Sequence, residues 1–167
     1  MRALDVAFVV VSAVLAGALG LVLYARRPPR RLPVLKGARR VLVPFAGSLD
    51  QRVLDAAIRI ARAEDAVLVP AYLLVVPLRY AEDSPLRDQV RVAMPLLEAV
   101  ELAALREGVP VDARIEKGRT LTHAVKRLWT EEEFDRIVAA APSFTPKELA
   151  WLLTNSPAET VVLKPAA

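Results

Sequence analysis

The sequence predicts an α/β fold, a five-stranded, mostly parallel, doubly wound sheet preceded by one transmembrane helix. Three observations support this prediction. Short apolar runs alternate with amphipathic segments through residues 39–167, residues 6–24 form one charge-free apolar stretch, and a strongly basic segment separates the two parts. We therefore divide the chain into a transmembrane helix (residues 1–25), a basic, proline-rich juxtamembrane linker (residues 26–38) and an α/β domain (residues 39–167).

The composition excludes several classes of protein. Of the 167 residues, 54% are hydrophobic and 25% are charged, which is too apolar for a disordered chain. There is no cysteine and only one histidine. The sequence therefore lacks a disulfide framework, a thiol nucleophile and thiolate ligands, and we expect no metal site.

The apolar stretch of residues 6–24 predicts a membrane span. As a helix it is about 28 Å long, close to the hydrocarbon thickness of a bilayer. Four arginines follow it directly, namely Arg26, Arg27, Arg30 and Arg31. The positive-inside rule then places the α/β domain in the cytoplasm, on a single-pass anchor in the cell membrane. The alternative is a cleaved signal peptide with residues 16–18 as its cleavage site, but four arginines immediately after the apolar run would hinder translocation.

The basic linker predicts contact with the lipid bilayer. Its arginines could bind anionic lipid headgroups. The alternative is that they serve only as a signal that sets the orientation of the span in the membrane. In the apolar stretch, Ser12, Ala16 and Gly20 recur every four residues, which suits contact with an integral membrane partner as well as simple lipid-facing filler. Residues 41–167 carry 15 Lys and Arg against 18 Asp and Glu, so we expect no nucleic-acid partner.

Five apolar runs in the α/β domain predict strands, and the segments between them predict helices. The strands are expected at residues 41–45, 66–76, 111–115, 135–141 and 159–164. The expected helix starts are Ser48 in a capping box with Gln51, Ser84 followed by Pro85, the turn at Gly118, and Thr145 in a capping box with Glu148. Pro95 should kink or split the second helix, and Gly108 should end it.

Several of these segments resemble the universal stress protein family. The resemblance rests on the run Val41–Ser48, on Gly118 after the third predicted strand, and on Asp135-Arg136-Ile137-Val138, and it extends over residues 39–165. It implies a five-stranded doubly wound domain that commonly forms dimers and that binds ATP in some members. It also suggests that residues 160–164, in the last strand, form the edge of a homodimer.

The resemblance further implies that the nucleotide site is degenerate. Nucleotide-binding members carry an acidic residue where this chain has Ala46, two loop glycines where it has Ala140 and Ser143, and a Gly-Ser or Gly-Thr within the region that is here residues 153–156. A phosphate loop needs close backbone approach, often at positive φ, and no glycine follows Gly118. We therefore expect no bound cofactor. A weak anion site at Ser143, Thr145 and the helix start at Pro146 is the remaining alternative.

No other residues suggest catalysis, so we expect no catalytic site and no enzyme activity. His123 has no evident nucleophile as a partner and is interpreted as a surface or groove histidine. Residues 131–133, three consecutive glutamates, are interpreted as a solvated charge cluster, and Trp129 and Trp151 as core or interface anchors.

The sequence thus predicts a membrane-anchored, non-catalytic interaction or regulatory module with a degenerate ATP loop. Two alternatives remain open. One is a membrane-tethered adenine-nucleotide sensor, in which Ser143, Thr145 and Asn155 replace the missing glycines. The other is an accessory subunit of a transporter complex.

Overall fold

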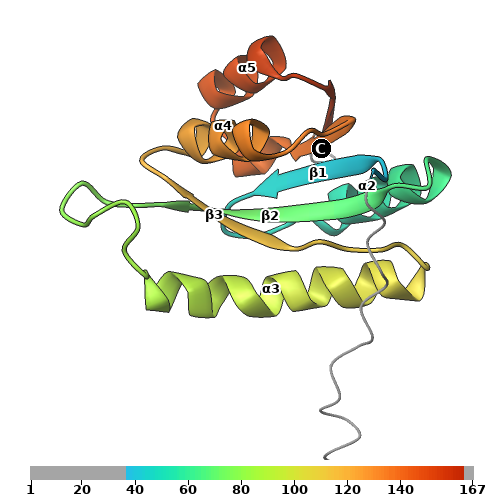
Figure 1. Cartoon of the computed structure of the whole chain (residues 1–167), viewed down its shortest axis with the longest axis horizontal. Helices are drawn as coiled ribbons and strands as arrows, with labels where there is room; N and C mark the ends of the chain where they lie inside the picture. Colours follow the sequence, from blue (N-terminus) through green and yellow to red (C-terminus); the bar gives the residue numbers. More distant parts are fainter. Residues whose placement is uncertain (1–36, 164–167) are drawn as a thin grey trace, which may run out of the picture. The chain divides into compact units, whose positions relative to one another are not determined.

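Five parallel strands lie at the centre of residues 37–163, the part of the chain that this computed structural model describes (Figure 1). In chain order the elements are β1 (Arg40–Phe45), α2 (Gln51–Ala63), β2 (Val67–Val75), α3 (Arg87–Arg106), β3 (Arg114–Gly118), α4 (Leu121–Glu131), β4 (Arg136–Ala140), a 3₁₀ turn η1 (Ala141–Ser143), α5 (Pro146–Asn155) and β5 (Glu159–Leu163). The strand order is β3-β2-β1-β4-β5, and every neighbouring pair is parallel. The predicted doubly wound sheet is confirmed.

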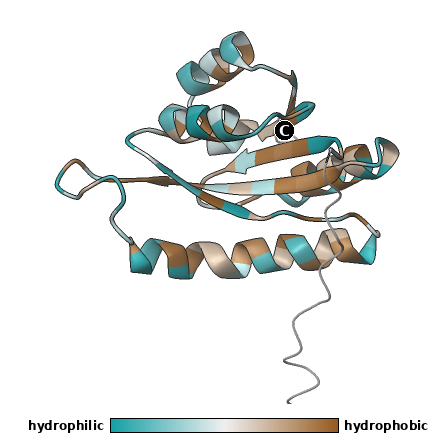
Figure 2. Ribbon diagram, viewed as in Figure 1, coloured by the Kyte–Doolittle hydropathy of each residue, from teal (hydrophilic) through white to brown (hydrophobic). Residues whose placement is uncertain are grey.

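Helices cover both faces of the sheet because the connections reverse direction after β3. Right-handed crossovers from β1 to β2 and from β2 to β3 place α2 and α3 on one face, whereas the return to β4 and β5 places α4 and α5 on the other (Figure 1). β1 and β2 are predominantly hydrophobic, whereas the edge strand β3 and the outer helix surfaces carry hydrophilic residues (Figure 2). β1 shows the result most clearly, since Val41, Leu42, Val43 and Phe45 are all 0% exposed.

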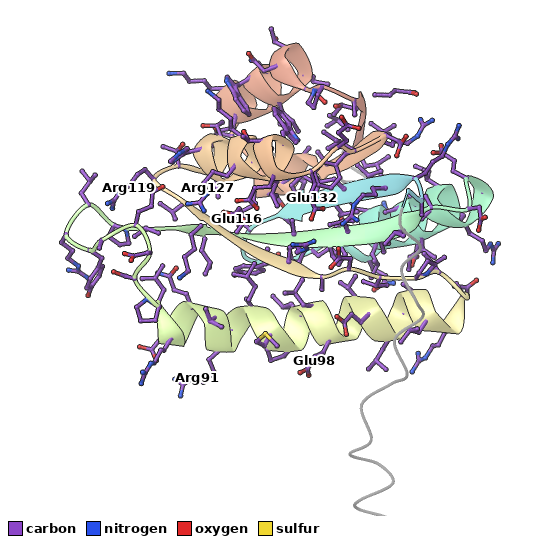
Figure 3. All side chains as sticks on the ribbon, in the orientation of Figure 1. Arg91, Glu98, Glu116, Arg119, Arg127 and Glu132 are labelled. Carbon is purple, nitrogen blue, oxygen red and sulfur yellow. The ribbon has the colours of Figure 1, made fainter. Side chains whose placement is uncertain are left out.

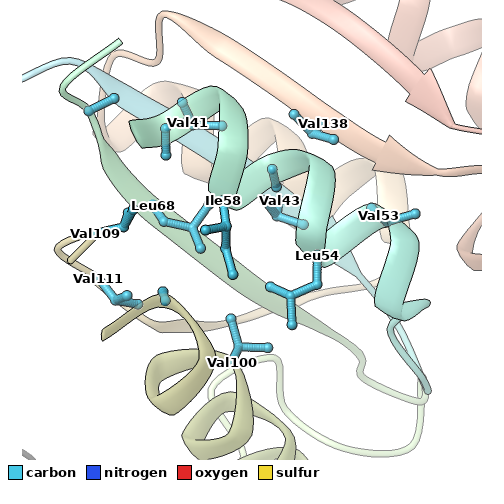
Figure 4. Close-up of a cluster of buried hydrophobic side chains, with 14 of the residues drawn as sticks. Val41, Val43, Val53, Leu54, Ile58, Leu68, Val100, Val109, Val111 and Val138 are labelled. Carbon is cyan, nitrogen blue, oxygen red and sulfur yellow. The ribbon is translucent and has the colours of Figure 1, made fainter. Parts of the chain in front are cut away.

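Each face of the sheet has its own apolar cluster. Beneath α2, the buried side chains of Val41, Val43 and Leu68 meet Leu54 and Ile58, and Val100 of α3 extends the cluster (Figure 4). Beneath α4 and α5, residues of the opposite strand faces meet Val125, Leu128 and Leu152. The alternation of strand side chains between the two clusters fixes the register of the sheet.

Two predicted helix starts are wrong. Asp50, not Ser48, caps α2, because the Asp50 carboxylate accepts the Arg52 N–H at 2.8 Å. α3 begins at Arg87 rather than at Ser84-Pro85, and it follows Leu86, which has a left-handed backbone with φ of 39°. The predicted capping box of Thr145 and Glu148 is confirmed at the start of α5.

α3 is one continuous helix, although Pro95 was expected to kink or split it (Figure 1). Pro95 lies on the exposed side, where water can satisfy the carbonyl that loses its hydrogen bond. Gly108, with φ of 74°, ends the helix as predicted. Its N–H donates to Leu105 O at 3.1 Å and the Val109 N–H donates to Ala104 O at 3.0 Å, the two bonds of a Schellman cap.

The third strand lies further along the chain than the predicted residues 111–115. Val111 makes a single bridge to Leu68, and continuous pairing with β2 runs from Arg114 to Gly118. The apolar pattern misses the second half of this strand because β3 is an edge strand that carries Glu116 and Lys117. Gly118 is required at its end, since a Cβ there would lie 2.5 Å from the backbone nitrogen of Ala124 in α4.

The predicted transmembrane helix and its four arginines lie outside the described residues, as do residues 32–36 and 164–167. Among the helices within residues 37–163, none has the length and hydropathy of a membrane span.

Candidate functional site

The strand order reverses between β1 and β4, which makes the carboxyl ends of these two strands the switch point of the sheet. Ligands of open α/β sheets bind outside the strand ends at this position. The structure places Ala46 directly after β1 and Ala140 at the end of β4, with Ser143 in the following 3₁₀ turn. The three residues predicted to mark a degenerate nucleotide site therefore lie at the position where such a site would form.

Phe144 follows the 3₁₀ turn and points into the protein. It is 7% exposed and belongs to the apolar cluster beneath α4 and α5, while its N–H donates to Ala141 O at 3.3 Å. The loop after β4 is therefore anchored by an aromatic side chain and a short turn. Sequence reasoning missed Phe144, because a phenylalanine beside Ser143 and Thr145 gives no local sign of which way it points.

The amino terminus of α5 is closed by the protein's own carboxylate. Glu148 accepts hydrogen bonds at 2.8 Å from both the backbone N–H and the hydroxyl of Thr145, and the Glu148 N–H donates to Thr145 Oγ1 at 3.3 Å. Pro146 at the first helical position has no N–H. A negative charge thus already occupies the helix end at which an external anion would be favoured.

The structure does not bring Ser143, Thr145 and Asn155 together. Thr145 and Asn155 lie at opposite ends of α5, a helix of 10 residues that is about 15 Å long. The Asn155 amide donates to Trp151 O at 2.8 Å, and the neighbouring Ser156 hydroxyl donates to Ala158 O at 2.7 Å. These side chains donate to nearby backbone carbonyl oxygens rather than converging on a ligand.

A groove of about 500 Å³ runs between the end of β2 and the start of α3; we call it the β2–α3 groove. Pairing of β2 with β1 ends at Tyr72, so the last three residues of β2 continue beyond the end of β1. The groove is lined by Tyr72, Leu73, Leu74, Val75, Asp88, Gln89 and Val92. The groove was not predicted from the sequence. It arises because β2 extends three residues further than its neighbour β1, and strand pairing of this kind is not visible in a local pattern.

Four alternating charges form an ion-pair cluster near the other end of the sheet, consisting of Arg40, Asp112, Arg114 and Glu132. Arg40 Nη2 lies 2.6 Å from both Asp112 Oδ2 and Glu132 Oε2. Arg114 Nη2 lies 2.9 Å from Asp112 Oδ2 and also contacts Glu132, which is labelled in Figure 3. The interpretation of residues 131–133 as a solvated cluster is therefore wrong for Glu132, which links α4 to β1 and β3. The sequence gives no sign of these contacts, because Arg114 and Arg40 lie 18 and 92 residues from Glu132 along the chain.

The surroundings shift the pKa values of two carboxyls in opposite directions. Burial alone raises the pKa of Asp112, but hydrogen bonds and charge from Arg114 and Arg40 outweigh it and hold that pKa below its ordinary value. Burial raises the pKa of Glu116, although Arg127 lies 3.0 Å from it and opposes the shift. Both carboxyls are paired with arginine, which is the pattern of a structural network rather than of a free acid or base.

A chain of charged contacts runs from Glu116 through Arg127 and Glu82 to His123, near the start of α4. His123 Nδ1 accepts the Arg119 N–H at 3.3 Å and lies 3.2 Å from Glu82 Oε1. Further along α4, the rings of Trp129 and Trp151 stack at 5.3 Å and 5° between α4 and α5. Within residues 37–163, no group of three or more histidine, cysteine or carboxylate side chains is arranged to hold a metal ion.

The comparisons with known proteins identify the fold. The sequence matches no family model and no curated protein. Among solved structures, a universal stress protein family member from Burkholderia pseudomallei is similar, at 22% identity over 77% of this chain and 97% of that chain, with a TM-score of 0.60. A universal stress protein in complex with cAMP is similar at 22% identity over 77% and 98%, and one from Archaeoglobus fulgidus in complex with dAMP at 13% identity over 74% and 96%, both with a TM-score of 0.60. The chain therefore has the universal stress protein fold.

Asp112 and Glu116 predict opposite effects of acid on stability. Because the native pKa of Asp112 is lowered, its stabilising contribution is present at neutral pH and is lost as the pH falls below about 4. Asp112→Asn should destabilise the protein by roughly 1–2 kcal/mol at pH 7 and by progressively less in acid.

The native pKa of Glu116 is raised, so protonation of this carboxyl favours folding. Glu116→Gln should remove that gain, and the free energy of unfolding should then fall more steeply as the pH is lowered. Denaturant unfolding across pH 3–7 checks both; parallel pH profiles for the two variants would contradict the assignment.

Proposed function

We propose that this protein is a non-catalytic interaction and regulatory module whose phosphate-binding position is closed by its own residues. The supporting observation is the α5 amino terminus, where the Glu148 carboxylate accepts two hydrogen bonds from Thr145 at 2.8 Å. A phosphate entering here would displace these bonds and lie beside a like charge, which is unfavourable. The 3₁₀ turn and the buried Phe144 hold the chain after β4 in a packed conformation, where a phosphate site would need a glycine-rich loop.

A non-catalytic role also fits the polar side chains of the described residues. The hydroxyls of Thr145 and Ser156 are engaged in local caps, and the carboxylates of Asp112, Glu116 and Glu132 face arginines. General acid-base or nucleophilic catalysis needs a free group beside a base that activates it. These groups instead stabilise the domain. The protein would therefore act through contacts that its surface makes with a partner.

Nucleotide binding is tested by isothermal titration of ATP, AMP and adenosine into the full-length chain in detergent. Because the phosphate position is closed, we expect no binding of any of the three at millimolar concentration. Binding of ATP at least about tenfold tighter than adenosine would contradict this proposal, since that difference requires stabilising contacts to phosphate.

A second candidate function is an adenine-nucleoside sensor, favoured by the β2–α3 groove. The similar structures with cAMP and dAMP show that the fold accommodates adenine nucleotides. Such a sensor would recognise the base and ribose without the phosphates, so ATP, AMP and adenosine would bind with similar affinity. Val92→Glu in the groove would then abolish binding, whereas Met94→Glu, on an exposed position of the same helix, would not.

We further propose that residues 1–25 anchor the domain at the cytoplasmic face of the membrane, with Arg26, Arg27, Arg30 and Arg31 at the headgroups. The full-length chain should then stay in the membrane fraction after an alkaline carbonate wash, and a chain starting at Gly37 should not. Replacing the four arginines with alanine should leave the chain in the membrane, because the apolar span supplies most of the free energy of insertion. Recovery of the full-length chain in the supernatant would contradict the anchor.

An accessory role in a transporter complex makes a separate prediction about the same segment. An integral membrane protein should co-purify with the full-length chain and should be lost when residues 1–25 are exchanged for an unrelated span of equal length. Retention of that protein after the exchange would assign its binding to the α/β domain instead.

We propose that β5 forms the edge of a homodimer. The edge strand β3 carries Arg114, Glu116 and Lys117, which discourage pairing with another chain, whereas β5 carries the half-buried run Val161–Leu163. Val161→Lys should weaken self-association by about tenfold or more, because the two-fold axis brings two lysines together. Leu153→Lys, at an exposed position of α5, is the matched control and should have no effect. Light scattering that gives a monomer for the unmodified chain would overturn the proposal.

A further inference from the structure

We propose that the β2–α3 loop (residues 76–86) is a proton-responsive element controlled by His123. The imidazole Nδ1 lies between a hydrogen-bond donor, the Arg119 N–H at 3.3 Å, and an acceptor, Glu82 Oε1 at 3.2 Å. It can pair with only one of them at a time: Nδ1 accepts from Arg119 when the ring proton is on Nε2 alone, and it donates to Glu82 when Nδ1 carries a proton. This inference goes beyond the proposed function and does not depend on nucleotide binding.

Two permanent cations already hold both ends of the β2–α3 loop. Arg119 Nη1 donates to the carbonyl oxygens of Val76 at 3.3 Å, Pro77 at 2.9 Å and Tyr80 at 3.0 Å. Lys117 Nζ donates to Ser84 O at 2.7 Å. Both residues belong to the end of β3 and the turn after it, beside which the loop projects from the sheet (Figures 1 and 3). The middle of the loop, at Glu82, is therefore the part whose attachment depends on pH.

The hydrogen bond from the Arg119 N–H selects the neutral tautomer with its proton on Nε2, in which Nδ1 is an acceptor and offers no proton to Glu82. Glu82 Oε1 is a buried atom without a hydrogen-bond partner in this arrangement, and the nearest arginine, Arg127, is 3.9 Å away. A buried carboxylate oxygen without a donor is unfavourable. Protonation places a hydrogen on Nδ1, which then donates to Glu82, and the Arg119 N–H loses its acceptor.

Charges from every neighbouring element act on this choice. Glu82 faces the imidazole from the loop, Lys126 lines the same surface groove on α4, and Arg127 on α4 is divided between Glu82 and Glu116 of β3. α5 contributes the neutral Asn155 to that groove. His123 lies in the first turn of α4, at the positive end of the helix dipole, and Glu82 is the carboxylate that contacts its ring.

Protonation thus exchanges a bond within the turn before α4 for an ion pair to the loop. Histidine is in general the side chain whose charge changes between pH 5 and 8, so these two sides of neutrality are the conditions to compare. The loop joins α3 through Leu86, whose φ of 39° is costly for a leucine, and α3 contributes Asp88, Gln89 and Val92 to the β2–α3 groove. The loop also presents Leu78, which is 89% exposed. A change at Glu82 therefore acts on a segment that borders the groove and carries an exposed apolar side chain.

Hydrogen exchange of the full-length chain at pH 5.5 and pH 7.5, corrected for the intrinsic effect of pH, tests the proposal. At the lower pH, the amides around Glu82 should gain protection by about two- to fivefold, the scale of a partly exposed ion pair, while the Arg119 amide should lose protection. The opposite signs distinguish this exchange of partners from a general effect of acid on stability.

Three variants assign the effect to specific atoms. His123→Asn keeps an acceptor for the Arg119 N–H but does not titrate, so it should show the pH 7.5 pattern at both pH values. Glu82→Gln should also lose the response, whereas Lys126→Gln, in the same groove but without a contact to Glu82, should retain it. An unchanged pH response in His123→Asn, or no response in the unmodified chain, would overturn the proposal. Thermal unfolding of each variant confirms that the compared proteins are folded.

Discussion

Burial of both faces of β1 is the constraint on which the rest of the structure depends. Val41, Leu42, Val43 and Phe45 have no exposed surface, so helices must cover the sheet from both sides. Because the crossovers are right-handed, helices cover both faces only if β2 and β3 are added on one side of β1 and β4 and β5 are added later on the other side. The reversal creates the switch point between β1 and β4, and the side chains that fill this position determine which ligands the fold can accept.

At this switch point the chain has a hydrophobically packed turn and a helix that is capped by its own side chains. Phe144 adds to the cluster beneath α4 and α5, and Glu148 supplies the negative charge that the helix terminus favours. Both arrangements contribute to stability, because the aromatic side chain is buried and the first turn of the helix has its cap. A groove lies nearby between β2 and α3, where the strand ends are uneven, and Arg119 and Lys117 hold carbonyl groups of the loop beside it.

The elements predicted well from the sequence are those determined by local patterns. Continuous apolar runs identify β1 and β4 because both of their faces are buried, and Thr145 with Glu148 identifies the start of α5 because a capping box is contained in four residues. The cap at Asp50 was missed because Ser48 matches the same pattern two residues earlier. The absence of glycines at Ala140 and Ser143 could be read directly, but Phe144, the partners of Glu132 and the β2–α3 groove depend on contacts between distant segments. Such contacts leave no periodic signal in the sequence.

The stacked pair of Trp129 and Trp151 gives the domain a built-in optical probe. These are the only two tryptophans of the chain, and their rings lie 5° from parallel with centroids 5.3 Å apart. The ultraviolet signals of both tryptophans therefore come from one place in the fold, the contact of α4 with α5. Any partner that separates these helices, or that locks them together, therefore changes a spectrum measured without a label.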